Sequence, residues 1–194
     1  MFAYLKGSFA LKTPTVVHID VHGVGYEVQV SLNTYSRIQN LEEGTLLTHL
    51  LVREDAHILY GFFDKAEKEV FLHLLSVSGV GASTARMMLS SLQAEEVVKA
   101  ILNGNVVLLE SVKGIGKKTA QRIVLELRDK LAKSPVEMNI SPLNHNSLDL
   151  DALTAMTALG IARNAAESAI KKARQMNTEF AEVQELIKVA LKCL

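Results

Sequence analysis

The 194-residue sequence has few of the residues that mark secreted or membrane proteins. It contains one cysteine, Cys193, no tryptophan and three prolines. A single cysteine cannot form an internal disulfide, which is typical of a reducing compartment. No apolar run reaches the ~18 residues that a membrane-spanning helix needs, and no basic segment precedes a long apolar one at the N-terminus. We therefore expect a cytoplasmic protein with no membrane contact.

Nucleotide-binding motifs are also absent. A Walker A loop would need a glycine where Ser111 stands and a serine or threonine where Lys118 stands. Thr84 and Thr119 occupy the third glycine position of two possible G-x-G-x-x-G motifs. The sequence therefore predicts that this chain does not hydrolyse nucleotides itself.

Candidate metal ligands do not gather in the sequence either. His18, Asp20 and His22 alternate along one expected strand face, so that neighbours in the set would lie about 6.6 Å apart. That spacing is awkward for three ligands around one ion, whose bonds are about 2 Å long. We expect no metal site, no cofactor and no catalytic residue.

The charged residues are unevenly distributed, although the net charge is zero. Residues 1–63 carry four basic and six acidic side chains, whereas residues 64–133 carry eleven basic and eight acidic ones. Opposite charges attract over several ångströms, so a polyanion would be drawn to the middle of the chain.

Hydropathy patterns divide the chain into four segments. Alternating apolar and polar residues in 1–63 predict short β-strands that form an OB-type barrel. Residues 64–133 change to helical spacing with short glycine-containing turns. Residues 134–147 hold two of the three prolines, which is typical of a linker, and 148–194 predict a small three-helix, UBA-like domain. The expected fold class is α+β and multidomain.

Three signals mark helix ends in the last segment. Gly160 is expected to end the first helix, because glycine readily adopts the left-handed conformation of a C′ residue. Asn164 and Glu167 have the spacing of a capping box for the second helix. Thr178 is placed to cap the third helix.

The most informative feature is a short sequence that occurs twice. Residues 76–85 (SVSGVGASTA) and 111–120 (SVKGIGKKTA) agree at six of ten positions. In each, a Gly-hydrophobic-Gly turn precedes a helix whose first N–H groups have no acceptor within the helix. Those donors and the positive end of the helix dipole attract anions. Glycine also lets a phosphate approach the backbone.

We interpret the repeat as two grips on the backbone of a nucleic acid. Backbone donors read no base, so that binding should be independent of sequence. The alternative is that both turns are ordinary connections between helices, in which glycine is common. The residues assigned to phosphate contact are Gly79, Gly81, Thr84, Gly114, Gly116, Lys117, Lys118, Thr119 and Arg122.

With these motifs, the chain resembles the RuvA family, whose members bind Holliday (four-way) junctions and work with the RuvB motor. The resemblance rests on VREDAHILYGFF in the first segment, on the two repeated turns and on DALTAMTALG in the last segment. It implies an OB-type domain, a tandem helix-hairpin-helix domain and a motor-binding third domain. It also implies homotetramers, alone or paired as octamers, and a RuvC-type resolvase as a further partner in recombination and repair.

The resemblance also implies roles for single residues. It adds Ser83 to the first hairpin, where relatives often have a lysine, and makes Arg86 a candidate for the missing charge. Glu54 and Asp55 match an acidic pin at the junction centre, where adjacent carboxylates would repel phosphates and keep the crossover open. The implied motor-binding residues are Met156, Leu159 and Ile161.

Two other functions stay open. A repair nuclease or glycosylase could hold duplex with the hairpins and use Glu54 and Asp55 as Mg²⁺ ligands, although adjacent residues on a turn rarely converge on one ion. An architectural protein would bind linear and branched DNA equally. Without the resemblance, Glu54 and Asp55 are typical of an exposed turn. The three residues Met156, Leu159 and Ile161 are then typical of a helical core.

Overall fold

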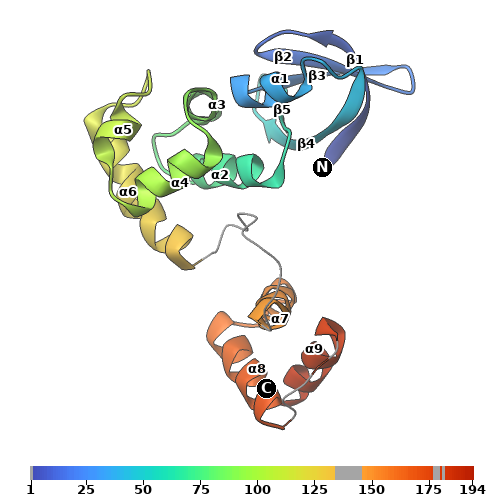
Figure 1. The fold of residues 1–194 in the computed structure, drawn as a ribbon, viewed down its shortest axis with the longest axis vertical. Coiled ribbons are helices and arrows are strands. Elements are labelled where there is room, and N and C mark those ends of the chain that lie inside the picture. The colour runs from blue at the N-terminus through green and yellow to red at the C-terminus, as the bar shows by residue number, and fades with distance from the viewer. Residues whose placement is uncertain (1, 134–145, 177–179, 181) are drawn as a thin grey trace. The chain divides into compact units, whose positions relative to one another are not determined.

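The computed structural model describes residues 2–133, 146–176, 180 and 182–194. The chain forms two compact units, Met1–Asn139 and Ile140–Leu194 (Figure 1). The expected linker lies outside the described residues except for its last two positions, which begin a helix. The expected cap Thr178 also lies outside them. The boundary near residue 63 stays a prediction, because both of its sides belong to the first unit.

The N-terminal part of the first unit is a closed five-stranded barrel. Its strands are β1 (Tyr4–Lys12), β2 (Val16–Val21), β3 (Val24–Val30), β4 (Glu43–Val52) and β5 (His57–Phe62). Their order is β1-β2-β3-β5-β4, with β1 paired to β4 and only β3 and β5 parallel among the described pairs. Helix α1 (Leu32–Ile38) connects β3 to β4. This arrangement is an OB-type barrel, as predicted.

A two-residue turn joins β2 to β3. His22 and Gly23 both have positive φ, 52° and 86°, which is the geometry of a type I′ hairpin turn. The Gly23 N–H donates to Asp20 Oδ1 at 2.7 Å and closes the turn. The single strand face expected for His18, Asp20 and His22 is wrong, because His22 lies in the turn.

The rest of the first unit is helical. Its helices are α2 (Lys65–Leu75), α3 (Ala82–Ser91), α4 (Ala94–Leu102), α5 (Val106–Glu110) and α6 (Lys117–Lys133). Their buried side chains form one core that also contains Tyr60 and Phe62 of β5. Phe71 of α2 packs on both rings, with centroids 5.1 and 4.9 Å from its own. The barrel and the helices therefore share apolar packing.

A buried carboxylate joins α1 to α2. The hydroxyls of Ser31 and Thr34 donate to the two carboxylate oxygens of Glu67, that of Thr34 at 2.6 Å. Ser31 Oγ in turn accepts from the Thr34 N–H as the N-cap of α1, at 2.9 Å. Thr34 Oγ1 accepts from the Phe63 N–H, at 3.0 Å. Each hydroxyl proton is thus directed at the carboxylate.

Further hydrogen bonds connect the barrel to α3. The Asn33 amide donates to the carbonyls of Leu89 and Leu92, at 2.6 and 3.0 Å. The Arg86 guanidinium donates to the carbonyl of Thr15 at 3.2 Å. Because α2 and α3 flank the first repeated turn, both helices of that hairpin are attached to the barrel.

The second unit contains α7 (Asn146–Ala158), α8 (Arg163–Met176) and α9 (Val183–Lys192). As predicted, Gly160 is the C′ residue that terminates α7, and its φ is 89°. The Gly160 N–H donates to Thr157, and the Ile161 N–H donates to Met156, at 3.0 and 3.1 Å. These two bonds form a Schellman motif.

The expected capping box of the second unit is wrong. Helix α8 begins at Arg163, so Asn164 lies inside the first turn. Glu167 instead pairs with Arg163, with Nε and Oε1 2.8 Å apart. Throughout the described ranges, no helix combines the length and apolar character that crossing a membrane requires.

The pH dependence of stability should reveal the buried carboxylate. Burial raises the pKa of Glu67, although hydrogen bonds from Ser31 and Thr34 oppose the shift. The folded state then holds the proton more tightly than the unfolded state, so stability falls as pH rises from the ordinary glutamate pKa to the raised value. Urea titrations at a series of pH values measure the free energy of unfolding of the wild type minus that of Glu67→Gln. We expect this difference to fall as the pH rises above the ordinary pKa of glutamate. A difference that rises over this range would contradict the assignment.

Candidate nucleic-acid interface

The two repeated sequences fold into the same turn. In each, the residue after the first glycine donates its N–H to the carbonyl three residues earlier, at 3.0 and 3.1 Å. The first glycines, Gly79 and Gly114, have φ of 90° and 92°, as the third position of a type II turn requires. Val80 and Ile115 are buried in the helical core. The apolar residue therefore anchors each turn in the core.

The second glycines have no such conformational role. Gly81 has φ −86° and ψ 166°, which any residue can adopt, and Gly116 has no positive φ. A Cβ added to either would meet nothing within 4 Å. Neither strain nor packing in the free protein requires glycine at these positions. Glycine at these positions leaves room for a ligand to approach the backbone closely.

Helices α3 and α6 begin directly after these glycines. Gly81 is the N-cap of α3, and no side chain caps that helix. The first intrahelical bonds run from Ala85 to Gly81 and from Ala120 to Gly116, both at 2.9 Å. The three residues before each of these alanines have no intrahelical acceptor for their N–H groups. Two sets of backbone donors therefore lie beside an open glycine.

The second hairpin carries most of the positive charge. Lys117 and Lys118 are exposed, and neither has an ion-pair partner among the residues that the structure describes. Arg122 is exposed too, but its Nε lies 2.6 Å from Glu126 Oε1, so its charge is partly neutralised. Lys113 is exposed in the turn itself and is absent from the predicted set. The sequence did contain a signal for Lys113: it lies within the repeat, at the position where the first copy has a serine.

The first hairpin has little charge of its own. Ser83 is exposed and Thr84 is partly exposed in the first turn of α3. Arg86 is partly buried, and its hydrogen bond to the barrel restricts where the guanidinium can reach. Any anion at this hairpin would be held mainly by backbone donors and hydroxyls.

Glu54 and Asp55 form the tip of the β4–β5 hairpin. The Arg53 N–H donates to the Ala56 carbonyl at 2.9 Å and closes the tip. Both carboxylates are exposed, and no cation pairs with them in the part of the chain that is described. Side chains of both strands pack against the helical core. Nowhere in the described residues do three histidine, cysteine or acidic side chains gather as metal ligands would.

The three residues predicted to bind a motor are not equivalent in the second unit. Met156 has no exposed surface and lies in the core. Leu159 is 68% exposed, directly before Gly160. Ile161 is partly buried against the same core. Of these three residues, Leu159 and Ile161 have surface that a partner could contact, and Met156 has none.

A groove between α7 and α8 was not predicted. Its volume is about 580 Å³, and its apolar lining comes from Leu150, Leu153 and Ile170. An ion pair between Arg174 and Asp149, 2.7 Å long, lies at its edge. The groove depends on the packing of two helices, which the sequence pattern alone does not reveal.

Comparisons with known proteins identify both parts of the first unit. Residues 1–61 match the model of the RuvA N terminal domain family. Residues 71–129 match the SAM-like helix-hairpin-helix tandem family. The second match covers both repeated turns.

Full-length relatives are similar over the whole chain. The Holliday junction branch migration complex subunit RuvA of Christiangramia forsetii is 46% identical over 194 residues, which are 100% of both chains. Its counterpart in Cytophaga hutchinsonii is 45% identical over 99% of both chains. The protein of the same name from Flavobacterium psychrophilum is 43% identical over 100% of both.

Replacing the two kinds of glycine should have different effects. Gly114→Ala should lower the free energy of unfolding by about 1 kcal/mol, because its φ is left-handed. Gly116→Ala should change it by less than about 0.5 kcal/mol, yet weaken duplex binding several-fold, because the methyl group blocks the approach of a phosphate. Urea titration and fluorescence anisotropy measure the two effects. Normal binding by Gly116→Ala would rule out the proposed contact.

The salt dependence of binding should distinguish the basic residues. Lys117→Ala and Lys118→Ala should each reduce the slope of log affinity against log salt by about 0.9. Arg122→Ala is the matched control and should reduce it less, since Glu126 already pairs with the guanidinium. Equal slopes for all three variants and the wild type would exclude phosphate contact by the lysines.

Proposed function

The chain belongs to the RuvA family, and we propose that it binds four-way DNA junctions as the DNA-binding subunit of a branch migration complex. The observation that carries this proposal is the repeated turn. Each copy places a glycine that neither strain nor packing requires at the start of a helix, and no side chain caps the first of these helices, α3. The names of the full-length relatives support the choice of a branched substrate over plain duplex.

Each hairpin is proposed to hold one stretch of phosphate backbone. N–H groups in the first turns of α3 and α6 would donate to phosphate oxygens, which the open glycines allow to come close. Lys117 and Lys118 would supply counter-charge at the second hairpin. At the first hairpin, the hydroxyls of Ser83 and Thr84 would assist the backbone donors. These contacts would hold the arms of a junction without reading their sequence.

The acidic pin, Glu54 and Asp55, is proposed to act by repulsion. Its carboxylates are exposed and lack cationic partners among the described residues. Placed at a crossover, they would repel the phosphates of the exchanging strands. The hairpins would attract the arms while the pin keeps their meeting point open.

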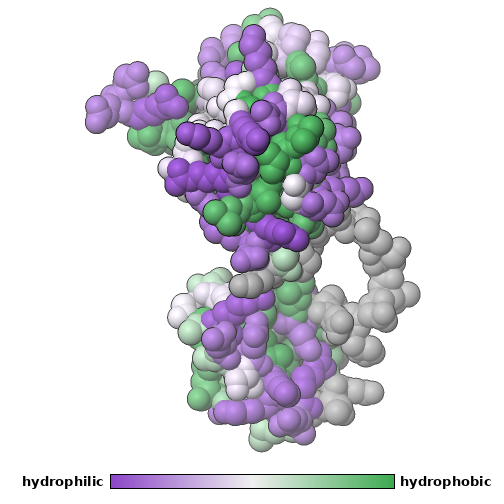
Figure 2. All heavy atoms as spheres, turned by 90° about the vertical axis from the view of Figure 1, so that its left-hand side faces the viewer, coloured by the Kyte–Doolittle hydropathy of each residue, from purple (hydrophilic) through white to green (hydrophobic). Residues whose placement is uncertain are grey.

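A junction has four arms, so we propose a fourfold homotetramer, alone or paired face to face as an octamer. Large apolar side chains on adjacent helices support a protein contact: Val107 of α5 is 79% exposed and Leu125 of α6 is 80% exposed. Figure 2 shows an apolar area among hydrophilic side chains on the side of the first unit where Figure 1 places these helices. Exposed apolar patches often mark such contacts.

The second unit is proposed to bind a RuvB-type ATPase, with a RuvC-type resolvase acting on the same junction. Leu159, Ile161 and the groove between α7 and α8 offer the apolar surface for the motor. The motor would supply ATP hydrolysis, and this chain would catalyse no step. We place the complex in the cytoplasm, where recombination and repair of bacterial DNA take place.

A competition gel shift tests the proposed function. A labelled four-way junction is bound and challenged with unlabelled linear duplex of the same sequence at several salt concentrations. We expect the junction complex to survive a duplex excess that fully displaces a labelled duplex. The double variant Glu54→Gln/Asp55→Asn should keep duplex affinity and lose part of this preference, because the repulsive charges are gone.

Two results would contradict the proposal. Equal competition by duplex against the wild type would indicate an architectural duplex-binding protein. Cleavage of the junction by the purified chain with Mg²⁺ would indicate a nuclease, and loss of cleavage in the same double variant would assign the metal site.

A further inference from the structure

Three of the four buried polar side chains that the structure describes meet at one place. Ser31, Thr34 and Glu67 have 2%, 0% and 5% of their surface exposed, and Thr48 is the fourth. Glu67 is the only ionisable member of this set. Its carboxylate accepts hydrogen bonds from the hydroxyl groups of Ser31 and Thr34. Burying a carboxylate costs desolvation free energy, which the two hydrogen bonds partly offset.

The cluster lies where three elements converge. Ser31 and Thr34 belong to the start of α1, and Glu67 lies in the first turn of α2. Phe63, whose N–H donates to Thr34, follows directly on β5. Strand β5 is one arm of the hairpin that carries the pin, and α2 leads into the first DNA-binding turn. One carboxylate therefore connects the pin's strand to the hairpin's helix.

The physical cost of the carboxylate argues for a geometric role. Burial raises the pKa of Glu67 because the ionised form is desolvated. Apolar groups of similar size often replace buried ionic groups without loss of stability. What an apolar side chain cannot supply is direction: two acceptor oxygens fix how α2 is rotated against α1. Hydrogen-bond angles restrict such rotation more narrowly than apolar contact does.

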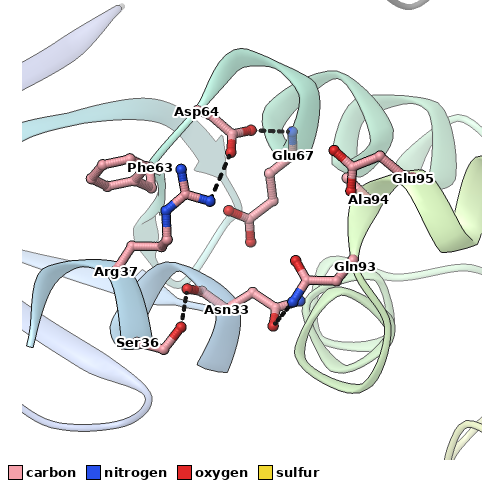
Figure 3. Close-up of a pocket in the computed structure, with 9 residues that line it drawn as sticks. All are labelled: Asn33, Ser36, Arg37, Phe63, Asp64, Glu67, Gln93, Ala94 and Glu95. Atoms are coloured by element: carbon pink, nitrogen blue, oxygen red, sulfur yellow. Dashed lines mark hydrogen bonds and ion pairs between the residues drawn. The ribbon is translucent and has the colours of Figure 1, made fainter. Parts of the chain in front are cut away.

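On the open side of the cluster, little packing restricts this angle. A cavity of about 110 Å³ adjoins Glu67 between α1, α2 and α4, which leaves room for water. Figure 3 shows the Glu67 side chain reaching toward α1, between Arg37 and Gln93. Arg37 Nη1 lies 3.9 Å from Asp64 Oδ2, a long and partly exposed ion pair. The hydrogen bonds of Glu67 therefore join α1 to α2 more closely than the Arg37–Asp64 pair does.

We propose that Glu67 is a positioning residue for junction recognition, which sets the angle between the acidic pin and the DNA-binding hairpins. The inference rests on the proposed function. If the pin points away from the crossover, the hairpins still bind phosphate, and only the preference for a branched substrate is lost. Glu67 therefore controls the ratio of junction to duplex affinity without contacting DNA.

The test compares junction and duplex affinities of the full chain and its variants by fluorescence anisotropy. Glu67→Leu and Thr34→Val should each weaken junction binding about tenfold and change duplex binding less than about twofold. Glu67→Gln keeps one acceptor oxygen and should rescue part of the loss. Thr34→Val removes the hydroxyl group and preserves the shape of the side chain. It therefore tests the same hydrogen bond if Glu67→Leu does not fold.

The control is Glu69→Gln, the same chemical change on the same helix. Glu69 forms an ion pair with Lys65, 3.6 Å away, and its side chain is 35% exposed, so both affinities should stay at wild-type values. A merely structural role for Glu67 would lower both affinities together as the folded fraction falls. Wild-type affinity ratios in folded Thr34→Val and Glu67→Gln would overturn the inference. Equal junction and duplex affinity in the wild type would instead refute the proposed function itself.

Discussion

The N–H groups at the starts of α3 and α6 set the requirements for the rest of the first unit. They can bind a phosphate only if nothing covers them, which explains why Gly81 and Gly116 leave open space where another residue would project a side chain. They must also stay in one place, which explains why Val80 and Ile115 bury the turns in a common core. Both features, the open glycine and the buried apolar residue, depend on neighbouring residues, and both occur in each copy of the repeat.

The two proposed phosphate-binding turns would not by themselves recognise a branched DNA, because every duplex offers phosphates. The site could recognise the shape of a junction if the two turns are held at a fixed orientation to the acidic tip between β4 and β5. Two features of the fold supply this orientation: the packing of Phe71 on Tyr60 and Phe62, and the directed hydrogen bonds of Glu67. The attractive and repulsive elements of the proposed site thus belong to one compact unit.

Much of this arrangement was predictable, because it depends on local signals. Alternating residues indicated the barrel, the change of period at Lys65 coincides with the start of α2, and the glycines of the repeat marked both turns. Long-range packing was not predictable. A glutamate in the first turn of a helix is usually exposed, and Glu67 is buried only because Ser31 and Thr34, more than thirty positions earlier, fold against it.

In the second unit, too, helix packing could not be predicted from the sequence. Met156 and Leu159 are neighbours in one apolar pattern, but only helix packing decides that Met156 is buried and Leu159 exposed. Asn164 and Glu167 had the spacing of a capping box, but α8 begins at Arg163 and its first turn is already helical there. Spacing indicates which residues share a face and does not fix the residue at which a helix begins.

The proposed site would hold a four-way junction open through fixed attractive and repulsive contacts. Energy transfer between dyes on the arm ends of a junction tests this most directly, with all six pairs of arms measured before and after the protein is added. In the complex, we expect equal distances for the four neighbouring pairs of arms and longer, equal distances for the two opposite pairs. Binding that leaves two arms stacked on the other two, with the distances of the free junction, would contradict it.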